Sequence, residues 1–254
     1  MKEPKAMAYV NMYGVLGALE NLCSLDDPAR EILRGLKKPV SLCFQVKDGP
    51  CCTFHFTQEG CRMTEGDGGC TCKMNFSSPE KFNALIDENK PGLPGKNPVQ
   101  LLPFLLGPFT QLTSRLTELL RPSEEALQDR AFFEKSTVLT MYTIAGAISA
   151  LANTDSISQI SASYTVDGEI SLGIRDVAQV TISVQDHRFT TIKAPAEHPR
   201  AIMEFATIDL AYGLFTGQVS TINEMCKGTI HLRGMLSMVD NINRILNRVS
   251  AYLS

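Results

Sequence analysis

The pattern of apolar and polar residues along this chain occurs twice: a stretch with helical spacing is followed by several stretches with strand-like alternation. Apolar residues recur at helical spacing over residues 9–22 and again over 134–152. Alternating segments, typical of half-buried strands, cover 40–47, 51–57, 60–64 and 70–76 in the first half and 169–177, 180–186, 188–193 and 200–205 in the second. A short helix is predicted after each set, over 79–86 and 207–215. The pattern therefore predicts two related halves, each with a helix, antiparallel strands and further helices.

The residues themselves also repeat. Residues 11–22 align with 140–151 at an offset of 129, with Met-Tyr, Gly-Ala and the last Leu identical, and residues 74–86 align with 203–215 at the same offset. Two separated matches at one offset are hard to obtain by chance. We therefore predict an internal duplication with domains 1–122 and 123–254. Pro122 ends one helix, and Ser123 with two following glutamates is typical of the start of the next.

The late parts of the two halves differ. In the second half a strand is predicted over 228–233, and Gly234 and a strongly apolar helix over 235–252 follow it. In the first half residues 91–108 contain five prolines, which argue against a regular central strand there. The first domain is thus expected to be divergent in its late part.

The order of these motifs resembles that of sterol carrier protein 2 (SCP-2) domains. The resemblance rests on Phe44-Gln45-Val46-Lys47-Asp48-Gly49-Pro50 and residues 70–85 in the first half, and on residues 205–217 and 226–235 in the second. It implies an α+β fold of two SCP-2-like domains, each a mostly antiparallel sheet of about five strands covered by helices. It also implies an apolar cavity between sheet and helices that takes a sterol, fatty acid or fatty acyl-CoA. The second domain is the more typical in its late part.

The candidate binding residues lie in the second half, on the strand, short helix and last helix that the resemblance places around the cavity. They are Phe205, Leu210, Leu214, Phe215, Met235, Met238, Val239 and Ile242. The same apolar stripe is equally typical of an ordinary core-facing helix. Methionines would add an adaptable wall if a tunnel lies behind it.

Eight cysteines are many for a chain of 254 residues, and six of them fall between Cys43 and Cys72. Cys70 and Cys72 are expected on one face of a strand, and Cys51 and Cys52 on opposite faces. No Cys-x-x-Cys spacing typical of zinc is present, so plain reduced thiols are expected and no metal ligand is assigned. Because the second half has almost none of these cysteines, the cluster is not expected to belong to a function that both halves share.

Charge and motifs exclude several functions. With 24 basic and 27 acidic residues the net charge is −3, so the excess of basic residues expected of a nucleic-acid-binding protein is missing. The same charge favours at most transient membrane contact. The sequence shows no signal peptide and no membrane-spanning segment, so a cytoplasmic protein is expected. There is no nucleophile elbow, His-Glu-x-x-His, P-loop or Gly-x-Gly-x-x-Gly motif. The chain is therefore predicted to be no enzyme, with no catalytic residues and no cofactor.

These observations leave three functions open. The favoured one is non-catalytic binding or transfer of a lipid-like small molecule, with the second half as the likelier binder. The alternative is an accessory or protein-interaction module whose cavity is filled by side chains. A third is a metal- or redox-linked role of the cysteine cluster in the first half. The two halves are expected to pack as an internal pseudo-dimer, and a homo-oligomer remains open.

Overall fold

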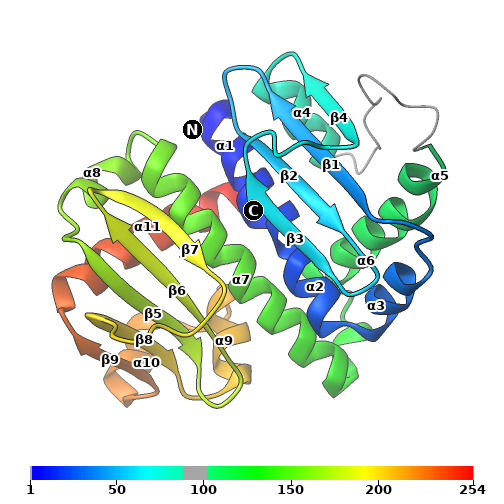
Figure 1. Ribbon diagram of the computed structural model, residues 1–254. Helices are drawn as coiled ribbons and strands as arrows, with labels where there is room; N and C mark the ends of the chain where they lie inside the picture. The colour runs from blue at the N-terminus through cyan, green and yellow to red at the C-terminus, as the bar shows by residue number, and fades with distance from the viewer. Residues whose placement is uncertain (1, 88–101, 254) are drawn as a thin grey trace. The chain divides into compact units, whose positions relative to one another are not determined.

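The computed structural model describes residues 2–87 and 102–253, and it shows two compact units, Met1–Leu127 and Gln128–Ser254 (Figure 1). Each unit has its own β-sheet covered by helices. The predicted α+β class with two sheets is therefore confirmed.

The sheet of the first unit has four strands in the order β3-β2-β1-β4. Strands β1 (Val40–Val46), β2 (Cys51–Phe56) and β3 (Cys61–Glu65) form an antiparallel meander, and β4 (Cys72–Phe76) pairs parallel to β1. All four predicted strands are present. Pro103 and Pro108 lie in helical segments, and the other three prolines of the Pro-rich stretch lie outside the described residues.

The helical segments of the first unit lie largely behind its sheet in Figure 1. Their bounds are α1 (Pro4–Tyr9), η1 (Val10–Val15), η2 (Leu16–Ala18), α2 (Leu19–Leu25), α3 (Asp27–Arg34), α4 (Pro79–Asp87), α5 (Leu102–Phe104), η3 (Leu105–Phe109), α6 (Thr110–Leu120) and η4 (Ala126–Gln128). The predicted helix over 9–22 is thus helical, but it passes through π-helical and 3₁₀ turns.

Strand alternation gives the first sheet two unlike faces, since neighbouring residues of a strand point to opposite sides. One face carries Leu42 and Phe44, and Phe44 centres an aromatic cluster with ring contacts to Phe54, Phe76, Phe82 and Phe109. The other face carries the polar and thiol side chains of Ser41, Cys43, Cys51, Thr53 and His55. Apolar packing is therefore confined to one side of the sheet.

The sheet of the second unit has five strands in the order β7-β6-β5-β8-β9. They are β5 (Gly168–Ile174), β6 (Ala178–Gln185), β7 (Arg188–Ile192), β8 (Ala201–Phe205) and β9 (Ile230–Gly234). Strand β8 pairs parallel to β5, as β4 does to β1, and all other pairs are antiparallel. Helices α7 (Arg130–Thr154), α8 (Ser158–Ser163), α9 (Ile208–Phe215), α10 (Thr221–Lys227) and α11 (Leu236–Leu253) complete the unit.

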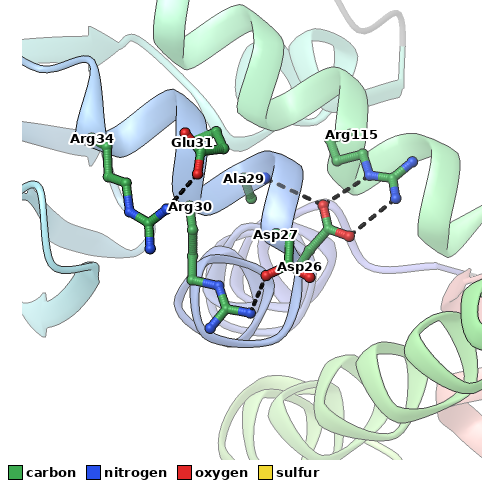
Figure 2. Close-up of polar contacts among 7 residues, drawn as sticks. All are labelled: Asp26, Asp27, Ala29, Arg30, Glu31, Arg34 and Arg115. Atoms are coloured by element: carbon green, nitrogen blue, oxygen red, sulfur yellow. Dashed lines mark hydrogen bonds and ion pairs between the residues drawn. The ribbon is translucent and has the colours of Figure 1, made fainter.

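Each unit has a buried ion pair at the same place in the fold. Asp26 caps α3 by accepting the amide of Ala29, and Arg115 of α6 donates to both of its carboxylate oxygens at 2.9 and 3.0 Å (Figure 2). In the second unit Asp155 takes the place of Asp26, and Arg248 of α11 donates to it at 2.9 Å. The carboxylate side chains of both aspartates are fully inaccessible to solvent. Each pair ties the end of the first long helical stretch to the last helix of its unit.

The second pair has more partners. The Asp155 carboxylate also accepts the Tyr252 hydroxyl at 2.7 Å and both the amide and the hydroxyl of Ser158. Burial by itself raises the pKa of Asp155, but the hydrogen bonds from Arg248, Tyr252 and Ser158 outweigh burial and hold that pKa well below its usual range. The carboxylate is therefore charged in the folded unit at neutral pH.

Gly234 at the end of β9 is expected to be intolerant of alanine. Its φ is +81°, and an added Cβ would lie 2.1 Å from the carbonyl oxygen of Arg200. Gly217 has a similar φ of +71° but open space around it. The left-handed conformation alone costs an alanine about 1–2 kcal/mol. We expect Gly217→Ala to destabilise the second unit by about that amount and Gly234→Ala by clearly more, as measured by denaturant unfolding. Equal losses would contradict the close backbone approach.

Candidate functional site

The first unit contains an apolar cavity of about 130 Å³ between its sheet and its helices. Its floor is formed by Phe44 of β1 and Met74 of β4, which share the apolar face of the sheet. The walls come from η1 and η2 on one side, from α4, and from η3 with α6. Asp87 and Arg121 line the cavity and are exposed, so the cavity meets solvent beside these two side chains.

Ten of the lining side chains are apolar and six carry polar groups. The apolar residues are Val15, Leu16, Phe44, Met74, Leu85, Ile86, Leu105, Phe109, Leu116 and Leu120. The polar residues are Asp87, Thr110, Thr113, Ser114, Thr117 and Arg121. A concave, mainly apolar lining with a few polar groups is the usual character of a small-molecule site.

Two π-helical segments border this cavity. Val15 ends η1, and Leu105 and Phe109 begin and end η3. Segment η3 contains Pro108, whose ring cannot fit a regular α-helix without displacing the carbonyl four residues earlier. Such π turns push side chains out of the regular helical register, and they occur often at functional sites. In the second unit, α7, which corresponds to the stretch from α1 to α2, is a regular α-helix over 25 residues.

The threonines of α6 present few free polar atoms to the cavity. Thr110 donates its hydroxyl to the carbonyl of Leu105 at 2.8 Å, Thr113 to that of Phe109 at 3.1 Å, and Thr117 to that of Thr113 at 3.0 Å. Because each hydroxyl already donates to a backbone carbonyl of the helical stretch that carries it, these side chains do not require a polar group from a ligand. The lining is thus compatible with a hydrocarbon chain.

These lining residues were not among the candidates named from the sequence. The available signal was the spacing of Leu112, Leu116, Leu119 and Leu120 on the helix after the Pro-rich stretch, with threonines at 110, 113 and 117 beside them. That pattern predicts an amphipathic helix but not a gap behind it. The π turns that border the gap are likewise not shown by any periodicity.

The structure also places the second-unit candidates on elements that contact one another. Phe205 ends β8, Leu210, Leu214 and Phe215 lie on α9, and Met238, Val239 and Ile242 lie on α11. Both α9 and α11 contact β8, and the rings of Phe205 and Phe215 meet edge to face at 5.5 Å. The exposed fractions of Phe205, Met238, Val239 and Ile242 are 5 % or less, whereas Leu210, Leu214, Phe215 and Met235 are half-buried. Whether these residues bind a ligand stays a prediction.

Comparison with known proteins gives likenesses to single SCP-2 domains. No family model and no curated protein matches the chain. Among solved structures, the chain is similar to a UbiJ-SCP2 ubiquinone synthesis protein, at 11% identity and TM-score 0.32 over 42% of this chain and 94% of that one. It is similar to sterol carrier protein 2, at 14% identity and TM-score 0.34 over 43% of this chain and 92% of that one. It is also similar to a conserved hypothetical protein of Thermus thermophilus that is described as possibly a sterol carrier protein. There the identity is 13% and the TM-score 0.32, over 43% of this chain and 83% of that one.

The cysteines of the first unit divide between the two faces of its sheet. Cys52 and Cys72 lie on the apolar face and are buried. Cys43 and Cys51 lie on the other face, with their sulfur atoms 3.9 Å apart. Cys70 precedes β4 and its sulfur lies near that of Cys43, so the expectation that Cys70 and Cys72 share a face is wrong. The chain turns between these two residues before the strand begins.

The raised pKa values of Cys43 and Cys70 argue against a reactive thiol at these two positions. Burial raises the pKa of Cys43, and burial together with the charges of Cys43 and Asp67 raises the pKa of Cys70 to about 11. A nucleophilic cysteine needs the opposite shift, since the thiolate is the reactive form. His55 is held at both ring nitrogens, by Ser41 at 3.0 Å and Thr64 at 3.0 Å, and does not face a thiol as a base.

Over residues 2–87 and 102–253, no helix combines the length and the apolar character that crossing a bilayer requires.

Proposed function

We propose that the first unit binds the apolar part of a lipid-like molecule, without catalysis, in the cavity between its sheet and helices. The observation that carries the proposal is the apolar cavity bordered by π-helical turns at Val15, Leu105 and Phe109. Such distorted helix turns occur often at functional sites. The proposal moves the favoured site from the second unit to the first.

The size of the cavity limits what it binds. Drug-sized ligands occupy pockets of about 300–1,000 Å³, and an engineered apolar cavity of about 150 Å³ holds one benzene. The cavity of about 130 Å³ therefore accommodates a segment of a flexible chain rather than a complete rigid ring system. We propose an acyl or similar chain whose end enters the cavity while its polar head stays near the exposed Arg121.

Blocking the cavity with Val15→Phe tests this proposal. Val15 is half-buried and lines the cavity, so a larger side chain there fills the space that a chain would occupy. In a titration with dodecanoate followed by calorimetry, we expect wild type to bind and Val15→Phe to lose at least about tenfold in affinity. Filling a void at a tolerant site usually leaves stability unchanged or raises it, so the fold should be retained.

A matched variant in the second unit separates the two possible sites. Leu214 is half-buried on α9, and Leu214→Arg places a charge among the second-unit candidates. Dodecanoate binding should survive this change. If Leu214→Arg abolished binding and Val15→Phe did not, the site would lie in the second unit. If wild type bound neither dodecanoate nor cholesterol, the interaction-module alternative would replace the carrier proposal.

A further inference from the structure

The polar face of the first sheet carries a cluster of side chains that apolar ligand binding does not use. The sulfur atoms of Cys43 and Cys70 and a carboxylate oxygen of Asp67 all lie within 4.8 Å of one another. Cys43 is fully buried, whereas Cys70 is half-buried and Asp67 is exposed. The cluster is separate from the cavity, because Cys43 and Phe44 are adjacent in β1 and point to opposite faces.

The path of the chain explains why these residues meet. Three strand spacings, about 14 Å, separate β3 from β4, and only residues 66–71 connect them. Six residues span at most about 20 Å. The connection is therefore too short to make a wide detour, and it runs close to the face of the sheet. Thr53, fully buried, holds it down by donating to the carbonyl of Gly66 and accepting the amide of Gly68. The loop thereby carries Asp67 and Cys70 onto Cys43.

We propose that Cys43, Cys70 and Asp67 bind a thiophilic divalent cation of the Zn²⁺ type. Zinc bound tetrahedrally at about 2.3 Å to sulfur and about 2.0 Å to oxygen sets ligand separations of about 3.8 Å between two sulfurs and about 3.5 Å between sulfur and oxygen. The Cys70 sulfur lies 3.6 Å from Asp67 Oδ1. The Cys70–Asp67 separation fits two ligands of one tetrahedral ion, and the Cys43 sulfur lies within 4.8 Å of both ligand atoms.

Charge supports the same assignment. Binding releases the protons of two thiols to solvent and leaves two thiolates and one carboxylate around the ion. Lys73 donates to Asp67 Oδ2 at 2.5 Å, which leaves Oδ1 on the side of Cys70. Together the divalent cation and the Lys73 ammonium balance the three negative charges.

The second unit shows that the fold does not need thiols at these positions. Thr181 corresponds to Thr53, because it holds the β7–β8 connection by donating to the carbonyl of Ala194 at 2.7 Å. Ser171 pairs with Thr181 as Cys43 pairs with Thr53, and Gln179 stands where the first unit has Cys51. Residues 193–200 contain no cysteine. The same scaffold thus occurs with and without the ligand set, and Cys43→Ser introduces a residue that the sister unit already carries there.

Zinc affinity measured against a chromophoric chelator, on the full chain kept reduced, tests the proposal. We expect wild type to bind one Zn²⁺ at this site. Each of Cys43→Ser, Cys70→Ala and Asp67→Asn should lower its affinity by at least about tenfold, the scale seen even for supporting residues of metal sites. Cobalt should give a thiolate charge-transfer band in wild type that is lost in Cys70→Ala. Cys70 lies in a loop and is half-buried, so this variant keeps the fold, as circular dichroism will verify.

Two control variants leave the proposed ligands intact. Cys52→Ala changes the neighbour of Cys51 on the opposite face, and Cys226→Ala changes an exposed thiol of the second unit. Both should bind Zn²⁺ as wild type does. Zinc affinity that is unchanged in a Cys43→Ser, Cys70→Ala double variant would overturn the proposal. So would a Cys43–Cys51 disulfide formed in air by a chain that binds no zinc when reduced. Dodecanoate binding should be unaffected by any of these variants, so this test is independent of the proposed function.

Discussion

Replacing Arg248 with methionine is expected to destabilise the second unit by about 3–5 kcal/mol, the usual cost of leaving one charge of a buried pair without its partner. Asp155 is inaccessible to solvent and would keep only the hydrogen bonds from Tyr252 and Ser158. Methionine preserves most of the side-chain volume, so the loss would report the missing charge rather than a cavity. Arg115→Met should have the same effect on the first unit through Asp26.

The control for this prediction lies one turn away on the same helix. Arg244 pairs with Asp240 at 3.0 Å, but both side chains are more than half exposed. Exposed pairs of this kind contribute about 0.3–0.5 kcal/mol, so Arg244→Met should change stability little. Native-state hydrogen exchange of the β5 and β8 amides would measure the second unit by itself. An equal loss in Arg244→Met and Arg248→Met would contradict a special role for the buried pair.

The same pair sets a pH dependence. The pKa of Asp155 is lower in the folded unit than the unfolded value of about 3.9, so its contribution to stability is complete above that value and is lost as the pH falls below it. In Arg248→Met that carboxyl would lose its strongest stabilising partner. The stability difference between wild type and Arg248→Met should therefore narrow as the pH falls below about 4. A difference that stays constant down to acid pH would contradict this account.

Phe44→Ala is the second change with a large expected effect. Phe44 is 1 % exposed, contacts four other phenylalanine rings and forms part of the cavity floor. Removing a buried phenylalanine ring costs about 3–5 kcal/mol, because the lost contacts are joined by an enlarged void. Hydrogen exchange of the β1 and β2 amides should show this loss in the first unit, while the second unit's exchange stays at its wild-type rates.

The enlarged void of Phe44→Ala should also bind small apolar molecules. A ligand that binds only the folded unit stabilises it by mass action, so benzene should restore part of the lost stability. Phe189→Ala in the second unit is a matched control, since Phe189 is 2 % exposed on β7 and is not among the residues lining the cavity. Rescue of Phe189→Ala alone would contradict the placement of the open space in the first unit.

Much of the architecture could be predicted from the sequence because it follows from local periodicity. The alternation over 40–47 and 169–177 and the helical spacing over 134–152 report which face of an element is buried, and the structure has strands and a helix there. Short helices such as α3 and α8 were not predicted. An aspartate precedes each of them, Asp26 before α3 and Asp155 before α8, and its carboxylate accepts the amide three residues later. The two aspartates stand at the repeat offset of 129 and could have been noticed as a pair.

The candidate sites depended on features that lie beyond such patterns. The arginines that pair with the two aspartates are 89 and 93 residues away in the chain, and periodicity says nothing about such distant contacts. The glycine, strand and glycine over 228–234, before the last helix, favoured a site in the second half. The cavity described above instead lies in the first unit, beside the π turns of η1 and η3. Likewise, a strand was predicted over 70–76, but β4 begins at Cys72, and only the strand order shows that residues 66–71 cross the sheet.

If the first of the two units provides the apolar binding site, a lipid should co-purify with the chain unless that cavity is blocked. Native mass spectrometry of the chain purified without detergent, followed by lipid extraction, measures this. We predict one bound chain-bearing molecule per protein in wild type and in Leu214→Arg, and none in Val15→Phe. A bound lipid that survives Val15→Phe and disappears in Leu214→Arg, or no bound lipid in any of the three, would contradict the claim.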